Sequence, residues 1–133
     1  MDEQKIKKSS YAPLEKLWIW KEAIELHRLI DELLKETKGQ SVGKKQIDRS
    51  SQSVPDNIAE MHGAFYFEVK LNSLRIARKE AYETINHIKK FEVKRVWQQN
   101  VCNNLTSRYN KLIFGVNKYI KYVNETKEKF GLK

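Results

Sequence analysis

Apolar residues recur along this chain at alternating steps of three and four, the spacing that gathers side chains on one face of an α-helix. The segment around Pro13 and Glu15 has the features of a helix start. A proline near the first helical position loses no hydrogen bond, and an early acid suits the helix dipole. The stripe that follows predicts a helix to about Thr37. Its members are Ile19, Ala23, Leu26, Ile30 and Leu33.

A second stripe begins after a turn expected at residues 38–43, and a proline interrupts it. Pro55 lies within the stripe, where it removes one backbone hydrogen bond and crowds the preceding turn. The stripe continues in phase beyond Pro55, which favours a kink near residues 52–53 over a break. Its members are Ile47, Ser51, Val54, Ile58 and Met61.

Two more stripes complete the pattern. Gly63 favours an end to the second helix, and the third stripe predicts a helix to about Lys90. After a short connection at residues 91–94, we expect a fourth helix from about Lys94 to Lys127. The third stripe contains Phe67, Leu71, Leu74, Ala81, Ile85 and Ile88, and the fourth contains Val101, Leu105, Leu112, Val116, Tyr119 and Val123.

Long helices joined by short links pack antiparallel to their neighbours around one core. We therefore expect an all-α protein, an antiparallel up-and-down four-helix bundle whose second helix is kinked at Pro55. Two prolines and five glycines are too few for the frequent turns of an all-β protein. One domain is expected over residues 1–133, with a flexible N-terminal arm at residues 1–11 and a frayed C-terminus at residues 128–133.

The composition argues against several other classes of protein. An apolar content of 40% is enough for one core without disulfides or a structural metal. The longest all-apolar runs have four residues, at 17–20 and 64–67, so we expect no membrane span, no signal segment and a cytoplasmic location. Cys102 is the only cysteine. It cannot form an internal disulfide and is expected to pack as a small hydrophobic residue.

The net charge of +9 is concentrated in the last third of the chain. Residues 1–85 contain 15 Lys and Arg against 14 Asp and Glu, a net of +1, whereas residues 86–133 contain 11 against 3, a net of +8. A localised positive field favours a polyanionic partner, because neutralising phosphates releases condensed counterions. The alternative is that the lysines serve only solubility.

Three segments resemble one bacterial family. Residues 46–60, QIDRSSQSVPDNIAE, are similar to the segment Q-I-R-R-A-A-x-S-I-P-x-N-I-A-E-G of the 23S rRNA intervening-sequence proteins, also called S23 ribosomal proteins. Residues 17–26 resemble the family's opening L-x-V-W-K-x-A-x-E-L, and residues 74–83 resemble its L-R-x-A-R-G-S-L-x-E. The three segments occur in the family's order. Met61 replaces a glycine of the family, and Lys79 and Glu80 replace its Gly-Ser.

The resemblance implies a four-helix bundle of a family whose biochemical role is not well defined. The accessory protein of diversity-generating retroelements is similar to this family. It is a basic homopentameric bundle that binds nucleic acid and a reverse transcriptase. By this analogy we expect a homo-oligomer, with a pentamer favoured, and nucleic acid as a partner.

The predicted fourth helix places cations among aromatic residues on its outer side. At about 100° per residue, Lys111, Lys118 and Lys121 fall opposite the apolar stripe, with Phe114 among them and Tyr122 beside them. Such a surface suits a phosphate backbone with stacked bases. The alternative is that the two aromatic side chains are buried in a subunit interface while the lysines remain solvated.

A second cationic cluster brackets the predicted turn between the third and fourth helices. It contains Lys89, Lys90, Lys94 and Arg95, although Lys89 and Lys90 could equally serve to complement the helix dipole. With Arg108 and the three lysines above, these residues complete the predicted nucleic-acid-binding set. The residues predicted for an oligomer or partner interface are Trp18, Glu60, Phe114 and Tyr122.

Arg78 falls by the same angular argument within the apolar face of the third helix, where a cation needs a partner. Glu60 or Glu83 could supply one, and a structural ion pair between Arg78 and Glu83 is the first interpretation. A functional site is the alternative.

The sequence contains no recognisable catalytic or metal site. The three histidines, at positions 27, 62 and 87, stand on different predicted helices without ligand spacing, so we expect no metal and no cofactor. No base is placed beside Ser50, Ser51 and Ser53, and close helix packing explains small residues there. Residues 39–43 lack the ending of a phosphate-binding loop.

The leading hypothesis is a non-enzymatic, basic, homo-oligomeric bundle that binds nucleic acid, RNA or RNA/DNA, through phosphate contacts. The alternative is a protein-interaction scaffold for a partner such as a reverse transcriptase. In that case Trp18, Trp20, Phe114 and Tyr122 would provide the surface.

Overall fold

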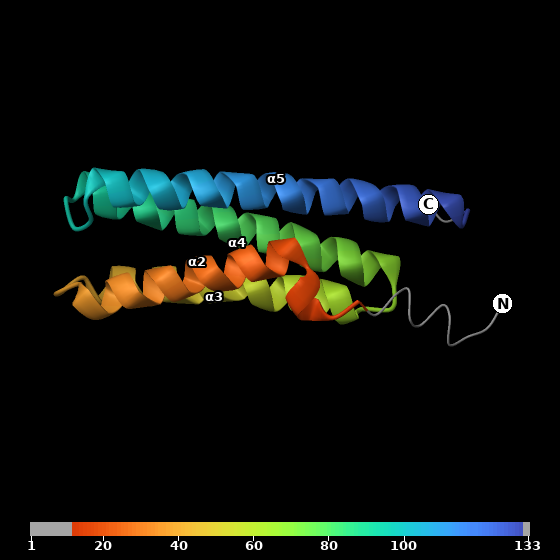
Figure 1. Ribbon diagram of the computed structural model, residues 1–133, viewed down its shortest axis with the longest axis horizontal. Helices are drawn as coiled ribbons and strands as arrows, with labels where there is room; N and C mark the ends of the chain where they lie inside the picture. Colours follow the sequence, from red (N-terminus) through yellow and green to blue (C-terminus); the bar gives the residue numbers. More distant parts are fainter. Residues whose placement is uncertain (1–11, 132–133) are drawn as a thin grey trace.

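The computed structural model describes residues 12–131, which form four long α-helices (Figure 1). The predicted flexible arm at residues 1–11 and the last two residues lie outside this part of the chain. The predicted frayed segment, 128–133, remains helical as far as Lys129. The elements are η1 (Leu14–Lys16, a 3-10 turn), α2 (Trp18–Glu36), α3 (Ser41–Gly63), α4 (Phe67–Val93) and α5 (Gln99–Lys129).

The helices lie side by side along the long axis of the molecule, each antiparallel to the next in sequence (Figure 1). α3 packs against α2 and α4, α4 packs against α5, and α2 meets α5 to close the bundle. Of these four adjacent pairs, α2 and α5 pack least closely. This arrangement confirms the predicted antiparallel up-and-down four-helix bundle.

One apolar cluster, contributed by all four helices, forms the core. The predicted stripes supply most of it, and Tyr109 of α5 is the largest side chain that is fully buried. Removing a Leu or Ile side chain from water contributes roughly 1.5–3 kcal/mol. The stripes therefore provide the main driving force for bringing the helices together.

The first long helix begins later than its proline predicted. Pro13 precedes only the single turn η1, and Leu17 then adopts an extended conformation, with φ −82° and ψ 113°. This bend lets Leu17 pack against the core. α2 therefore starts at Trp18, and the prediction of a helix from Pro13 was wrong by about one turn.

The connection between the last two helices also lies later than predicted. Phe91 is buried, packs edge-on against Trp97 with ring centroids 4.8 Å apart, and lies so close to Gly43 of α3 that a Cβ added there would be 3.0 Å from its ring. This packing extends α4 to Val93 and delays α5 to Gln99, so the predicted connection at residues 91–94 was wrong. Arg95 ends the turn in a left-handed conformation, φ 59°.

α3 is continuous from Ser41 to Gly63, with Pro55 buried in its interior. The proline therefore does not break the helix, as the continuing stripe indicated. The kink at Pro55 stays a prediction.

Candidate nucleic-acid interface

The cations predicted at the α4–α5 turn are exposed at one end of the bundle. Lys90 lies on the last turn of α4 with Lys89 just before it, and Lys94 and Arg95 lie in the connection that follows. Within the described residues none of the four forms an ion pair. Their charge is available to a partner.

The structure adds three lysines to this end that the sequence analysis missed. Lys38 lies in the α2–α3 connection, and Lys44 and Lys45 lie in the first turns of α3. In an antiparallel bundle the α2–α3 and α4–α5 connections lie at the same end (Figure 1). The predicted bundle therefore already implied that the lysines near residue 40 lie close to those near residue 90. We call the seven residues the cationic end: Lys38, Lys44, Lys45, Lys89, Lys90, Lys94 and Arg95.

A hollow of about 460 Å³ lies within the cationic end, between the first turn of α3 and the last turns of α4. Lys90 and Lys94 line one side of it, and Ser41 to Gly43 line the other. The side chain of Gln40 makes no capping bond at the start of α3. Backbone N–H groups at a helix start, next to lysines, favour an anion such as phosphate.

His87 also lines this hollow. Burial lowers the pKa of His87 below its ordinary value, and the charge of Lys90 lowers it further. The imidazole therefore resists protonation in the free protein. An anion bound in the hollow would offset the charge of Lys90 and favour the protonated form.

Some cations elsewhere in the described residues are held by acidic neighbours. Arg28 pairs with Glu25 and Glu32 along α2, and Lys127 pairs with Glu68 across α5 and α4. Pairs with an exposed partner contribute little stability, but they do reduce the local field. The field of the cationic end is not reduced by ion pairs of this kind, because none of its seven residues forms one within the described residues.

Arg108 does not belong with the exposed cations of the predicted binding set. Its Nε donates to Glu22 Oε2 at 3.1 Å and its Nη2 to Oε1 at 2.5 Å. The hydrogen bonds from the guanidinium to Glu22 raise the pKa of Arg108. The two side chains, 30% and 17% exposed, join α5 to α2. The charge of Arg108 is therefore already paired within the bundle.

The other residues predicted on the outer side of α5 are exposed as expected. Lys118 Nζ lies 4.8 Å from the centroid of the Phe114 ring, a cation–π contact. Lys121 and Tyr122 are exposed one turn further on. The aromatic side chains therefore remain available either to bases or to another protein surface.

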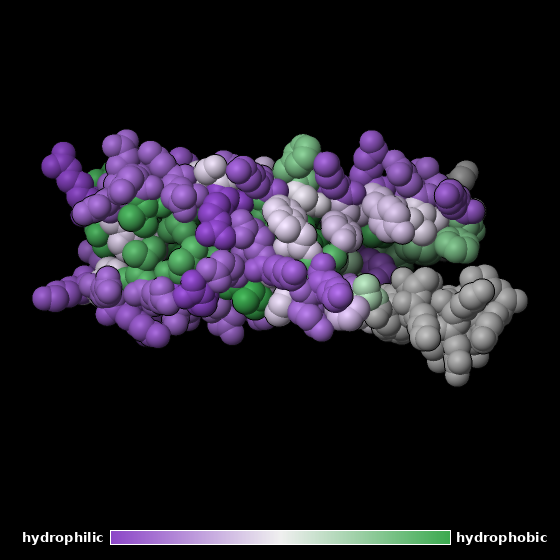
Figure 2. Space-filling model, viewed as in Figure 1, coloured by the Kyte–Doolittle hydropathy of each residue, from purple (hydrophilic) through white to green (hydrophobic). Residues whose placement is uncertain are grey.

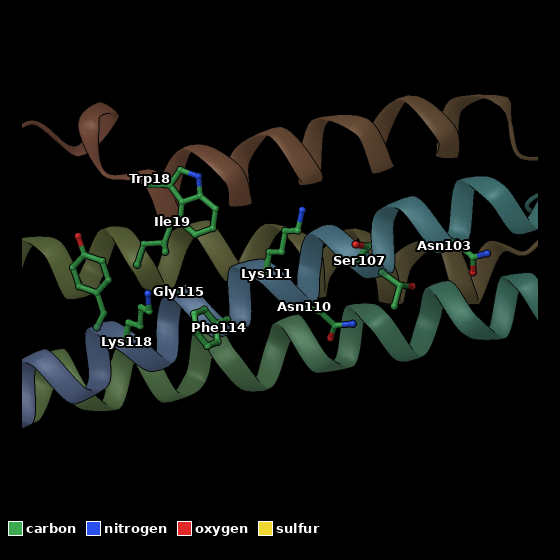
Figure 3. Close-up of a pocket in the computed structure, with 11 residues that line it drawn as sticks. Trp18, Ile19, Asn103, Ser107, Asn110, Lys111, Phe114, Gly115 and Lys118 are labelled. Carbon is green, nitrogen blue, oxygen red and sulfur yellow. The ribbon is translucent and has the colours of Figure 1, made fainter.

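Trp18 lies against α5 at Gly115 (Figure 3). A Cβ added at Gly115 would come within 2.6 Å of the indole Cζ3, so the missing side chain is what admits the ring. Trp18 remains 51% exposed. Together with Lys111 and Lys118 it lines an open hollow of about 870 Å³ that extends over the outer surface of α5.

The predicted ion pair between Arg78 and Glu83 is wrong. Arg78 Nη1 donates to Asn117 Oδ1 of α5 at 2.8 Å, whereas Glu83 accepts from Arg49 Nη2 of α3 at 2.8 Å. Five residues correspond to about 140° around a helix, so the two α4 side chains face different neighbours. Glu60, the other partner considered, is exposed.

Two polar contacts between helices were not foreseen. His27 Nδ1 lies 2.9 Å from Ser51 Oγ, and Ser50 Oγ lies 2.8 Å from Thr84 Oγ1. Ser51 is fully buried, so a substrate has no access to its hydroxyl. We therefore interpret the His27–Ser51 contact as a structural link between α2 and α3.

Residues 12–131 contain no group of three acidic, histidine or cysteine side chains placed to hold a metal ion. None of the helices in this range is long and apolar enough to cross a membrane.

The fold and the cationic end define a class, that of small basic four-helix bundles. The family model described as 23S rRNA-intervening sequence protein matches residues 15–118, and the chain belongs to this family. The resemblance noted in the three sequence segments is thus confirmed.

A solved structure shares the fold. The chain is similar to a crystal structure from Bacteroides thetaiotaomicron, a protein of unknown function from the S23 ribosomal protein family, with 24% sequence identity and a TM-score of 0.73. The match covers 77% of this chain and 98% of that one. A search of curated proteins found no match.

Proposed function

We propose that this protein is a non-enzymatic, homo-oligomeric bundle that binds nucleic acid, RNA or RNA/DNA, through phosphate contacts. One observation carries the proposal: the seven residues of the cationic end come together from two separate connections, and none forms an ion pair within the described residues.

The chemistry of the cationic end supports contacts to phosphate more than contacts to bases. Six of its residues are lysines, which act as point charges and carry little geometric specificity. Each phosphate that is neutralised releases counterions. A plot of the logarithm of the binding constant against the logarithm of the salt concentration therefore falls with a slope of about 0.7–0.9 for each phosphate contact. We therefore expect binding that depends strongly on salt and weakly on sequence.

A mobility-shift titration of the wild type with a structured RNA, at two salt concentrations, tests the proposal. The variant Lys90→Glu/Lys94→Glu/Arg95→Glu should bind at least about tenfold more weakly, with a salt slope smaller by roughly 2–3. The matched control is Lys16→Glu/Lys21→Glu/Lys79→Glu, three exposed lysines elsewhere with the same change in net charge.

The outcomes distinguish binding at the cationic end from a general attraction of RNA to the positive charge of the whole protein. A strong effect of the first variant with a weak effect of the control supports binding at the cationic end. Equal weakening by both variants would contradict a localised surface. Absence of binding by the wild type at low salt would reject nucleic-acid binding itself.

A further inference from the structure

The hollow between α3 and α4 places a histidine among lysines. His87 lines it together with Lys90 and Lys94, and Gln46 lines it from α3. Residues three and seven positions apart lie on the same face of a helix, so the two lysines stand on the same side of α4 as the imidazole. The volume of about 460 Å³ is within the range of pockets that hold small ligands.

The surroundings of this hollow favour an anion. Figure 2 shows hydrophilic side chains around both turns at this end of the bundle, at the left of the view. Among the described residues, the lining of the hollow includes no acidic side chain. The first backbone bond of α3 is donated by the N–H of Lys44 to Gln40 O at 2.8 Å, so the N–H groups of residues 41–43 receive no partner from the helix itself.

The charged groups that act on His87 come from α4 and α3. Burial lowers the pKa of His87 most, followed by the charge of Lys90; Glu83 raises the pKa and Arg49 lowers it. Arg49 is paired with Glu83 at 2.8 Å and with Glu80 at 3.2 Å, so these acids are already engaged. Within the described residues, α5, which also packs against α4, supplies none of the charges that act on His87.

A phosphate in the hollow would change the balance of charge around this imidazole. It would offset the positive charge of Lys90, and it would attract a proton to His87 directly. An opposite charge at roughly 4–6 Å changes the protonation equilibrium of a side chain by a factor of about ten or more. The protonated imidazole would then add a third cation to those of Lys90 and Lys94.

We infer that a phosphate of the nucleic-acid backbone binds in this hollow, and that its binding is coupled to the uptake of one proton by His87. Because the bound state takes up a proton that the free protein lacks, affinity rises as the pH falls. The inference rests on the proposed function, since the nucleic acid supplies the phosphate, and it adds control of binding by pH to that function.

A mobility-shift titration with a fully paired RNA, at constant salt and two pH values, tests the inference. The wild type should bind roughly fivefold more tightly at about pH 5.5 than at about pH 7.5. His87→Gln cannot take up the proton and should lose most of this ratio. His87→Lys carries a permanent charge and should lose it as well. His62→Gln, the same change at the opposite end of the bundle, is the matched control and should keep it.

Nuclear magnetic resonance of the wild type tests the same coupling without any substitution. Addition of the RNA should move the midpoint of the titration of the His87 imidazole to higher pH. An unchanged midpoint, or a ratio in His87→Gln equal to that of the wild type, would overturn the coupling and leave the proposed function standing. Absence of RNA binding by the wild type at low salt and at both pH values would reject the proposed function, and the coupling with it.

Discussion

At the scale of single residues, Gly115 determines how closely Trp18 approaches α5. We expect Gly115→Ala to destabilise the bundle by about 1 kcal/mol. The new Cβ would lie 2.6 Å from the indole and 2.9 Å from Ile19 Cγ2, and overpacking costs roughly 1–3 kcal/mol, offset by up to about 1 kcal/mol of helix propensity. Urea denaturation followed by circular dichroism measures the change.

Gly63→Ala is the control, because no heavy atom lies within 4 Å of a Cβ added there. It should be neutral or slightly stabilising. In a Trp18→Ala background the cost of Gly115→Ala should decrease, since the indole is the nearer obstacle. Equal or higher stability of Gly115→Ala in the wild type would show that Trp18 does not depend on this glycine.

Individual contacts are where the sequence was least informative. A helical wheel gives the direction of Arg78 on its own helix but not the side chain that meets it, and the structure supplies Asn117 instead of an acid. Arg108 looked like one more cation of the fourth helix until Glu22, 86 residues away in sequence, was seen to hold it. Such contacts depend on the rotation of two helices against each other, which periodicity does not determine.

At the scale of helices, the ion pair between Glu22 and Arg108 joins α2 to α5. These two helices pack less closely than the other adjacent helices of the bundle. A double-mutant cycle with Glu22→Gln and Arg108→Met should give a coupling free energy of about 1 kcal/mol, because both side chains are partly shielded from water. Urea denaturation of the two single variants and the double variant measures it.

The same cycle on Arg28 and Glu25, an exposed pair within α2 (53% and 42% exposed), should give a smaller coupling. Equal coupling in the two cycles would mean that shielding between α2 and α5 adds nothing to the pair.

The existence and order of the helices followed from the sequence, whereas the start of α2 and the connection between α4 and α5 did not. Four stripes of regular period outweigh any local signal, so the bundle was predictable. Pro13 looked like a helix start, but the packing of Leu17 moved the start to Trp18. Phe91 looked like a connection, but its contact with Trp97 kept it in α4. Tertiary packing decided both.

At the scale of the whole molecule, the cationic end and the outer surface of α5 around Lys118 are separate, because the first lies at one end of the bundle and the second lies along its side. Their contributions to nucleic-acid binding should therefore be separable. We expect Lys118→Glu to leave the affinity for a short RNA within about twofold, since one exposed charge away from the cationic end makes a small contribution. Titration calorimetry of this variant and of the wild type measures the difference. A loss as large as that of Lys90→Glu/Lys94→Glu/Arg95→Glu would place the binding surface on α5 instead.

The position of the cationic end in the antiparallel bundle has a consequence for how much of the molecule a bound phosphate backbone would cover. All seven cations are at the end where α5 begins. The 31 residues of α5 carry the bundle about 46 Å away from that end, at about 1.5 Å per residue. A nucleic acid held at the cationic end would therefore leave most of the length of the bundle uncovered, and those sides would remain open to another molecule at the same time.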